Sequence, residues 1–133
     1  MSAETLGFEM VDAAPNTFAV LSSGAAQAPN NAANPCFTQN PGSGILAMQF
    51  DGLRCVVVDF QRHGPRATDA NGDSGFTTPG WGPPDGPPGG LIAFAGFVSG
   101  QTRHFQAIYR DSEASICMTG SNTTQGVTIT IQP

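Results

Sequence analysis

Three oxygen-bearing side chains lie at alternate positions in one short, glycine-containing segment of this sequence. They are Asp69, Asn71 and Asp73. Side chains at positions i, i+2 and i+4 of a tight turn can converge on one ion, and carboxylate and amide oxygens suit Ca²⁺. The pattern is incomplete, because the twelfth position holds Gly80 where a calcium loop has a bidentate Glu. Two interpretations follow: a calcium site, or a loop whose carboxylates bond nearby backbone N–H groups.

A second segment whose residues could take part in catalysis is Arg62-His63-Gly64-Pro65-Arg66, directly after a Val-rich run. It matches the Arg-His-Gly-x-Arg signature of histidine phosphatases, and this resemblance implies a phosphate-accepting His63 with both arginines binding phosphate. That family has an α/β fold with long helices, for which this chain is too short. The segment therefore supports only an alternative function as a small hydrolase, including a metal-dependent form that adds Asp69 and Asp73. Otherwise the arginines pair with loop carboxylates, and His63 is a polar loop residue.

The single tryptophan, Trp81, lies between two glycines and precedes a run rich in proline. An exposed Trp on a stiff loop could stack on a sugar or anchor a protein partner. Alternatively, Trp81 folds back over an open end of the fold as a plug. The predicted ligand-binding residues are Trp81, Arg62, His63, Arg66 and Asp85.

Charged residues are scarce, at 11% of the chain, and the five basic residues are all arginines in a net charge of −5. Such a surface repels phosphate backbones, so we expect no nucleic-acid partner. No apolar run approaches the about 20 residues that span a bilayer, so we expect no membrane insertion. The sequence has two histidines and no lysine, so few residues could act in acid–base catalysis near neutral pH. We therefore expect the protein to have no enzymatic activity.

Cys36, Cys55 and Cys117 allow one disulfide plus one free thiol in three pairings, or three free thiols. Residues 1–20 carry three acidic residues and no basic start, so they do not resemble a signal peptide. Either the protein is cytoplasmic, or Met1 opens an excised mature domain. The abundance of small polar residues favours the second interpretation, and we expect a secreted protein.

Short strand-like segments alternate with turn signals along the chain. The seven segments are residues 6–10, 17–21, 45–50, 54–60, 91–98, 104–109 and 127–131. Asp51-Gly52 predicts a hairpin between the third and fourth. The pattern predicts one all-β domain over residues 1–133, an antiparallel β-sandwich with long Gly/Pro-rich loops. The stretch 61–90 is too long for a plain connection, so we expect an ordered functional loop.

Several stretches together resemble a β-rich module near the C-terminus of large secreted bacterial proteins. They are Phe50–Cys55, Gln61–Gly64, Trp81–Gly89, Gly100–Asp111 and Asn122–Gly126. The resemblance covers roughly residues 17–132 and rests mainly on an aromatic strand that ends in Tyr109-Arg-Asp111. It implies export and a β-rich fold, and it supplies no catalytic residues.

These observations predict a non-catalytic extracellular module that binds a protein or glycan surface through the 61–90 loop. The first alternative is a structural subunit of an extracellular assembly. It is motivated by an N-terminal strand before Pro15 that could add to a neighbour's sheet, and by a Thr-rich final strand without protective lysines. The second alternative is the small hydrolase.

Overall fold

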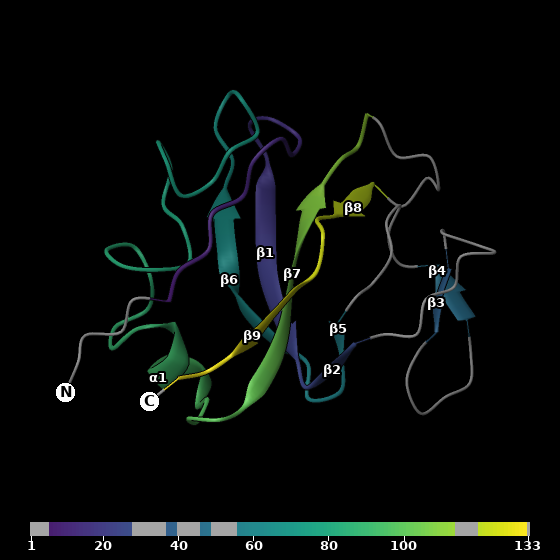
Figure 1. Ribbon diagram of the computed structural model, residues 1–133. Coiled ribbons are helices and arrows are strands. Elements are labelled where there is room, and N and C mark those ends of the chain that lie inside the picture. The colour runs from purple at the N-terminus through teal and green to yellow at the C-terminus, as the bar shows by residue number, and fades with distance from the viewer. Residues whose placement is uncertain (1–5, 28–36, 40–45, 49–55, 114–119, 133) are drawn as a thin grey trace.

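The computed structural model describes residues 6–27, 37–39, 46–48, 56–113 and 120–132 (Figure 1). Its strands are β1 (Phe18–Gly24), β2 (Ala26–Gln27), β3 (Phe37–Gln39), β4 (Leu46–Met48), β5 (Val56–Val57), β6 (Gln61–Ala67), β7 (Thr102–Arg110), β8 (Ser121–Thr123) and β9 (Val127–Thr130). One short helix, α1 (Leu91–Ala95), precedes β7. The predicted all-β class is confirmed.

The main element is a five-stranded antiparallel sheet in the order β6-β1-β7-β8, in which β9 also pairs with β7. Strand β7 is the longest described strand and contributes to three pairings, with β1 on one edge and with β8 and β9 on the other. Two further strand pairs are present: β2–β5, which contacts the ends of β1 and β7, and β3–β4, which lies apart from the main sheet in Figure 1. A sandwich of two packed sheets remains a prediction.

Alternation along β1 and β7 places the apolar side chains of both strands on one face of the sheet. Leu21 pairs with Ala107 across the two strands, and Ala19 pairs with Tyr109. The first three of these residues are at most 5% exposed. Non-strand residues complete this core, which comprises Met10, Ala19, Leu21, Trp81, Leu91, Phe97, Phe105, Ala107 and Ile131. Loops and a short helix therefore cover the inner face of the sheet.

Two irregularities interrupt the sheet at the level of the Leu21–Ala107 pair. On the β6 side, the register steps from Val20↔Pro65 to Ser22↔Arg62, so that residues 63–64 lie opposite Leu21 alone. Gly64 takes φ 79°, a backbone conformation that glycine adopts without strain. This is a β-bulge, which redirects the backbone and its side chains.

The second irregularity separates β8 from β9. Thr123 pairs with Ile108 and Val127 pairs with Phe105, so residues 124–126 lie opposite only Gln106 and Ala107. Thr124 bridges the interruption: its N–H donates to Ala107 O (2.9 Å), and its hydroxyl accepts from Ala107 N (3.0 Å). Strands β8 and β9 therefore form one strand with an extra residue.

The N-terminal segment runs alongside the long loop after β6, as the purple and teal traces of Figure 1 show. Met10 exchanges both backbone hydrogen bonds with Ser74 (2.8 and 2.9 Å), and Trp81 N–H donates to Phe8 O (3.2 Å). Ala13 N–H donates to Gly72 O (3.2 Å). These bonds hold residues 8–13 within their own chain, so the described part of the N-terminal segment does not extend outward as the strand-addition hypothesis required.

Three expectations about local structure were wrong. Residues 6–10 make one isolated bridge rather than a strand. Residues 91–95 are helical, because Gly96 at φ 69° caps the run and its N–H bonds Ala93 O; periodicity alone does not separate short buried helices from strands. Residues 61–67 belong to β6 rather than to the long loop.

The predicted Asp51-Gly52 turn lies outside the described residues, and its two flanking strands pair elsewhere. Strand β4 pairs with β3, and β5 pairs with β2. The described pairings therefore differ from the predicted hairpin.

Gly72→Ala should disrupt the contact between the N-terminal segment and the long loop, and so lower the free energy of unfolding. Gly72 has φ 86°, and a Cβ there would lie 1.9 Å from Ala13 O. We expect a loss well above the about 1–2 kcal/mol of left-handed strain alone. Gly100→Ala is the matched control, because Gly100 has φ 82° with no atom within 4 Å of its Cβ position. Equal denaturation midpoints for the two variants would contradict this packing.

Candidate functional site

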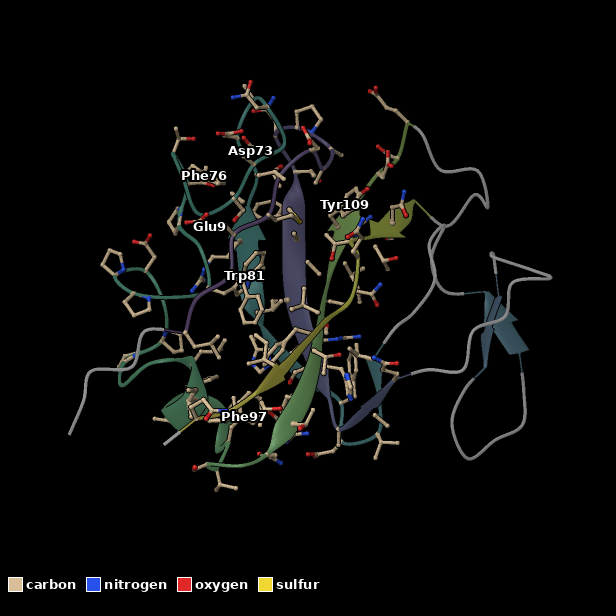
Figure 2. The ribbon with its side chains drawn as sticks, in the orientation of Figure 1. Glu9, Asp73, Phe76, Trp81, Phe97 and Tyr109 are labelled. Carbon is tan, nitrogen blue, oxygen red and sulfur yellow. The ribbon has the colours of Figure 1, made fainter. Side chains whose placement is uncertain are left out.

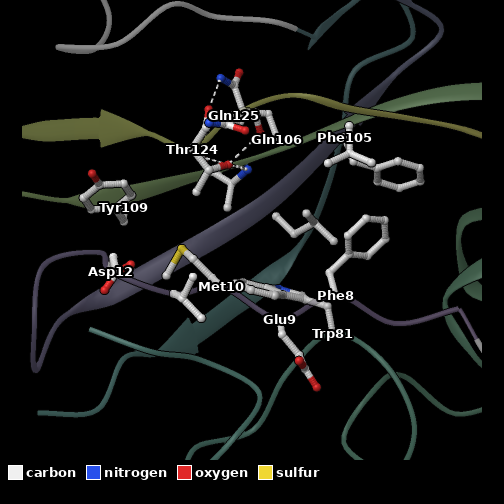
Figure 3. Close-up of a pocket in the computed structure, with 14 residues that line it drawn as sticks. Phe8, Glu9, Met10, Asp12, Trp81, Phe105, Gln106, Tyr109, Thr124 and Gln125 are labelled. Atoms are coloured by element: carbon white, nitrogen blue, oxygen red, sulfur yellow. Dashed lines mark hydrogen bonds between the residues drawn. The ribbon is translucent and has the colours of Figure 1, made fainter. Parts of the chain in front are cut away.

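A pocket of about 490 Å³ opens on the inner face of the sheet, between the N-terminal segment, β7 and the chain that leads into β9 (Figure 3). Ligand pockets commonly have volumes of 300–1,000 Å³. Its lining residues are Phe8, Glu9, Met10, Val11, Asp12, Leu21, Trp81, Phe105, Gln106, Ala107, Tyr109, Thr124, Gln125 and Val127. Most are apolar or aromatic, with polar groups at the margin, which is the usual composition of a small-molecule site.

Trp81 forms the base of this pocket and is not an exposed anchor. It is 1% exposed, and its indole Nε1 donates a hydrogen bond to Gly64 O (2.9 Å). The β6 bulge leaves that carbonyl available, since Gly64 is the residue that departs from the ladder. The expectation of an exposed Trp81 was wrong. The alternative, in which Trp81 packs back onto the fold, is confirmed and is visible in Figure 2.

Arg66 fixes the loop that carries Trp81. Its Nε donates to Gly80 O (2.6 Å), and its Nη2 donates to Asp85 O (3.1 Å). Because these carbonyls lie on both sides of Trp81 in the sequence, one guanidinium from β6 holds the loop against the sheet edge. Asp85 itself is exposed and takes part through its backbone.

The two ends of the pocket differ in chemistry. Phe8 and Phe105 pack together at one end, with ring centroids 4.6 Å apart. Tyr109 and Asp12 lie at the other end, with Met10 between the two ends in Figure 3. Burial, together with the negative charge of Asp111, raises the pKa of the Tyr109 hydroxyl, which therefore stays protonated at neutral pH. The pocket thus has an apolar end and a polar, negatively charged end.

The Arg-His-Gly-Pro-Arg segment does not assemble a phosphate site. Arg62 is exposed and lies over the Phe60 ring (5.8 Å), while His63 is buried. The Arg66 donors Nε, Nη1 and Nη2 are all bonded to backbone carbonyls. The three side chains that the phosphatase resemblance needs in one place therefore serve separate contacts.

His63 is a buried structural residue, 6% exposed, whose Nε2 lies 2.8 Å from Ser23 Oγ. Its ring packs near Phe97 and Phe105, at centroid distances of 6.0 and 6.1 Å. Burial, and then the positive charge of Arg103, lower the pKa of His63 to about 4. The imidazole is therefore neutral at physiological pH.

Arg103 is the second buried polar residue of this region and is 3% exposed. Its Nη2 pairs with Asp59 (2.6 Å), and its guanidinium carbon lies 4.6 Å from the centre of the Phe97 ring. Within the part of the chain that the structure describes, its Nε and Nη1 have no hydrogen-bond partner. The ion pair is partly open to solvent, because Asp59 is 57% exposed.

The carboxylates of the predicted calcium loop accept hydrogen bonds from the loop itself and from the N-terminal segment. Asp69 Oδ1 accepts from Asn71 N (2.8 Å) and Asp73 N (3.0 Å), and the Thr77 hydroxyl donates to Asp69 Oδ2. These hydrogen bonds lower the pKa of Asp69, that from Thr77 most strongly. Asp73 Oδ1 accepts from Asp12 N (3.1 Å).

Over the part of the chain that the structure describes, no cluster of three His, Cys, Asp or Glu side chains could hold a metal ion. The three cysteines lie outside it. The calcium interpretation stays a prediction, whereas the observed bonds of Asp69 match the alternative, an Asx-turn loop.

Of the five predicted ligand-binding residues, only Trp81 lines the pocket. Sequence reasoning missed the rest of the lining. The alternation Phe8-x-Met10 and Phe105-x-Ala107-x-Tyr109 signals a buried face, and it does not reveal that these two faces meet around a cavity. Thr124 gives no local signal at all, because its position depends on a bulge.

No model of a known protein family, no curated protein and no solved structure matches this chain. Among the described helices, none is long and apolar enough to cross a membrane.

Trp81→Ala should destabilise the fold by about 3–5 kcal/mol, because a fully buried aromatic ring and its hydrogen bond are lost together. The measurement is the free energy of unfolding in urea. Phe76→Ala is the control, an aromatic residue of the same loop that is 58% exposed, and it should change stability by under about 0.5 kcal/mol. Similar small losses in both variants would contradict the plug geometry.

The neutral His63 makes the protein less stable in acid. The unfolded chain binds a proton near pH 6.5 and the folded one near pH 4, so unfolding takes up protons between these values. Stability should therefore fall with decreasing pH, by at most about 1.4 kcal/mol per pH unit. Urea midpoints between about pH 5 and 6.5 measure this slope, where most carboxylates stay ionised. His63→Gln should flatten it, and His104→Gln, at the other histidine of the chain, should retain it.

Proposed function

We propose that this protein is a non-catalytic binding module that takes a small apolar ligand, or the apolar end of a larger one, into the Trp81 pocket. The observation that carries the proposal is the cavity itself, about 490 Å³ over a floor of buried apolar side chains. Apolar groups gain about 25 cal/mol for each Å² removed from water, so a preformed apolar cavity favours occupation.

The pocket is built rigidly, which supports binding rather than an incidental gap. Its base is fixed by the Trp81–Gly64 hydrogen bond and by the Arg66 contacts. Its wall is fixed by Thr124, which bonds both backbone groups of Ala107. A preformed site does not have to be ordered when the ligand arrives, and this reduces the cost of binding.

An extracellular setting and attachment to a surface remain parts of this proposal, supported by the low charge and the small polar residues of the sequence. The proposed ligand-binding region is the inner face of the sheet rather than the 61–90 loop. Of the ligand-binding residues predicted from the sequence, only Trp81 lines the pocket.

The proposal is tested with N-phenyl-1-naphthylamine, a neutral apolar dye whose emission rises in apolar surroundings. Trp81 is the chain's single tryptophan, so quenching of its fluorescence reports binding at the pocket base. We expect saturable binding of one dye per chain, with both signals giving the same affinity. A dye signal without any change in Trp81 emission would place the dye elsewhere.

Ala107→Leu should narrow the pocket and weaken dye binding without loss of stability, because its added carbons enter empty space. Ala19→Leu is the matched control. Ala19 is 0% exposed on the same face and does not line the pocket. Added methyl groups there should cost about 1–3 kcal/mol and leave dye binding intact. Paired dye titrations and urea unfolding curves provide both readouts, and unchanged dye binding in Ala107→Leu would refute the pocket as the site.

A further inference from the structure

We infer that the pocket selects small organic cations, amines carried on an aromatic or alkyl group, over neutral and anionic ligands of the same shape. This inference rests on the proposed function and names its ligand class. It is drawn from the lining chemistry of the two pocket ends and from the distribution of charge around them.

Four of the fourteen lining residues are aromatic, and they come from separate segments of the chain. Phe8 belongs to the N-terminal segment, Trp81 to the long loop, and Phe105 and Tyr109 to β7. The faces of aromatic rings carry partial negative charge and attract ammonium groups within about 6 Å. Of these rings, Tyr109 lies at the acidic end of the pocket, so it is the ring that an ammonium bound there would contact.

Charge around the pocket has one sign. The lining includes two acidic residues, Asp12 and Glu9, and none of the lining residues is basic. Glu9 packs against Gly75, and its carboxylate points away from the cavity in Figure 3. Asp12 lies at the Tyr109 end, where the charge of Asp111 also acts on the Tyr109 hydroxyl.

None of the four described arginines lines the cavity; they are Arg62, Arg66, Arg103 and Arg110. Arg66 is bonded to backbone carbonyls, and Arg103 is paired with Asp59 beside Phe97. Arg62 and Arg110 are exposed. The chain as a whole carries a net charge of −5. An anionic ligand would therefore enter the cavity without a counter-charge, at a high desolvation cost.

These features define the orientation of the ligand in the pocket. Its apolar group lies over Trp81 towards Phe8 and Phe105, and its ammonium lies beside Tyr109 and Asp12. The protonated Tyr109 hydroxyl and the Asp12 carboxylate can both accept hydrogen bonds from an ammonium. Thr124 is less suited to this task, because its hydroxyl is already bonded to Ala107 N.

The test compares 2-phenylethylamine, 2-phenylethanol and phenylacetate, which share a carbon skeleton and differ in charge. Each displaces N-phenyl-1-naphthylamine from the full chain at neutral pH and low salt. We expect the amine to bind at least about fivefold tighter than the alcohol, and phenylacetate to bind weakest. Added salt should weaken the amine alone.

Asp12→Asn is the decisive variant. Asp12 has φ 56°, which Asn adopts readily, so the fold should be kept. The amine should lose its advantage over the alcohol, and the alcohol should bind as before. Glu113→Gln removes the same charge from an exposed residue outside the lining, and it should preserve the amine preference.

The outcomes separate the two proposals. Equal binding of amine and alcohol by a chain that binds the dye would overturn the cation preference and leave the binding module standing. The same holds for a preference that survives Asp12→Asn or disappears in Glu113→Gln, since the charge would then act from elsewhere. Failure of the dye itself to bind would overturn both proposals.

Discussion

The hydrogen bond from the Trp81 indole to the Gly64 carbonyl determines how the rest of this protein is arranged. A buried indole N–H needs an acceptor, and β6, an edge strand that pairs only with β1 among the described strands, has carbonyls that the ladder does not use. The β6 bulge at residues 63–64 provides one. With Trp81 fixed on the sheet, the long loop has a defined path, and the N-terminal segment can pair with it through Phe8 and Met10.

The same arrangement explains why a cavity exists beside a well-packed core. Both bulges lie level with the Leu21–Ala107 pair, and Ala107 is a small residue at the centre of β7. Beside an alanine, the large ring of Trp81 leaves space that no other described side chain fills. Met10, Leu21, Trp81, Phe105 and Ala107 belong both to the core and to the pocket lining, so the packing that stabilises the sheet also shapes the pocket.

Much of the sheet could be predicted from the sequence, since β1, β7 and β9 follow apolar runs or strict alternation. The site could not. Its position depends on two bulges, and on the docking of residues 8–13 against residues 72–81, which is a contact between distant segments. Arg62, His63 and Arg66 show why a sequence motif alone does not identify a site. Their spacing matches a phosphate-binding motif, but strand alternation and the bulge direct the three side chains to different contacts. The segment that begins at Asp69 shows the same ambiguity. Its spacing of side-chain oxygens is compatible both with a cation site and with an Asx-turn in which Asp69 bonds the nearby backbone.

The interruption between β8 and β9 has a consequence for how such a protein can diversify. Residues 124–126 oppose only two residues of β7, so deletion of one residue there would bring β8 and β9 into a single continuous register. The pocket wall formed by Thr124 and Gln125 would then straighten, while the pairings on both sides stayed as they are. The length of the chain at this one point therefore helps to set the shape of the pocket wall.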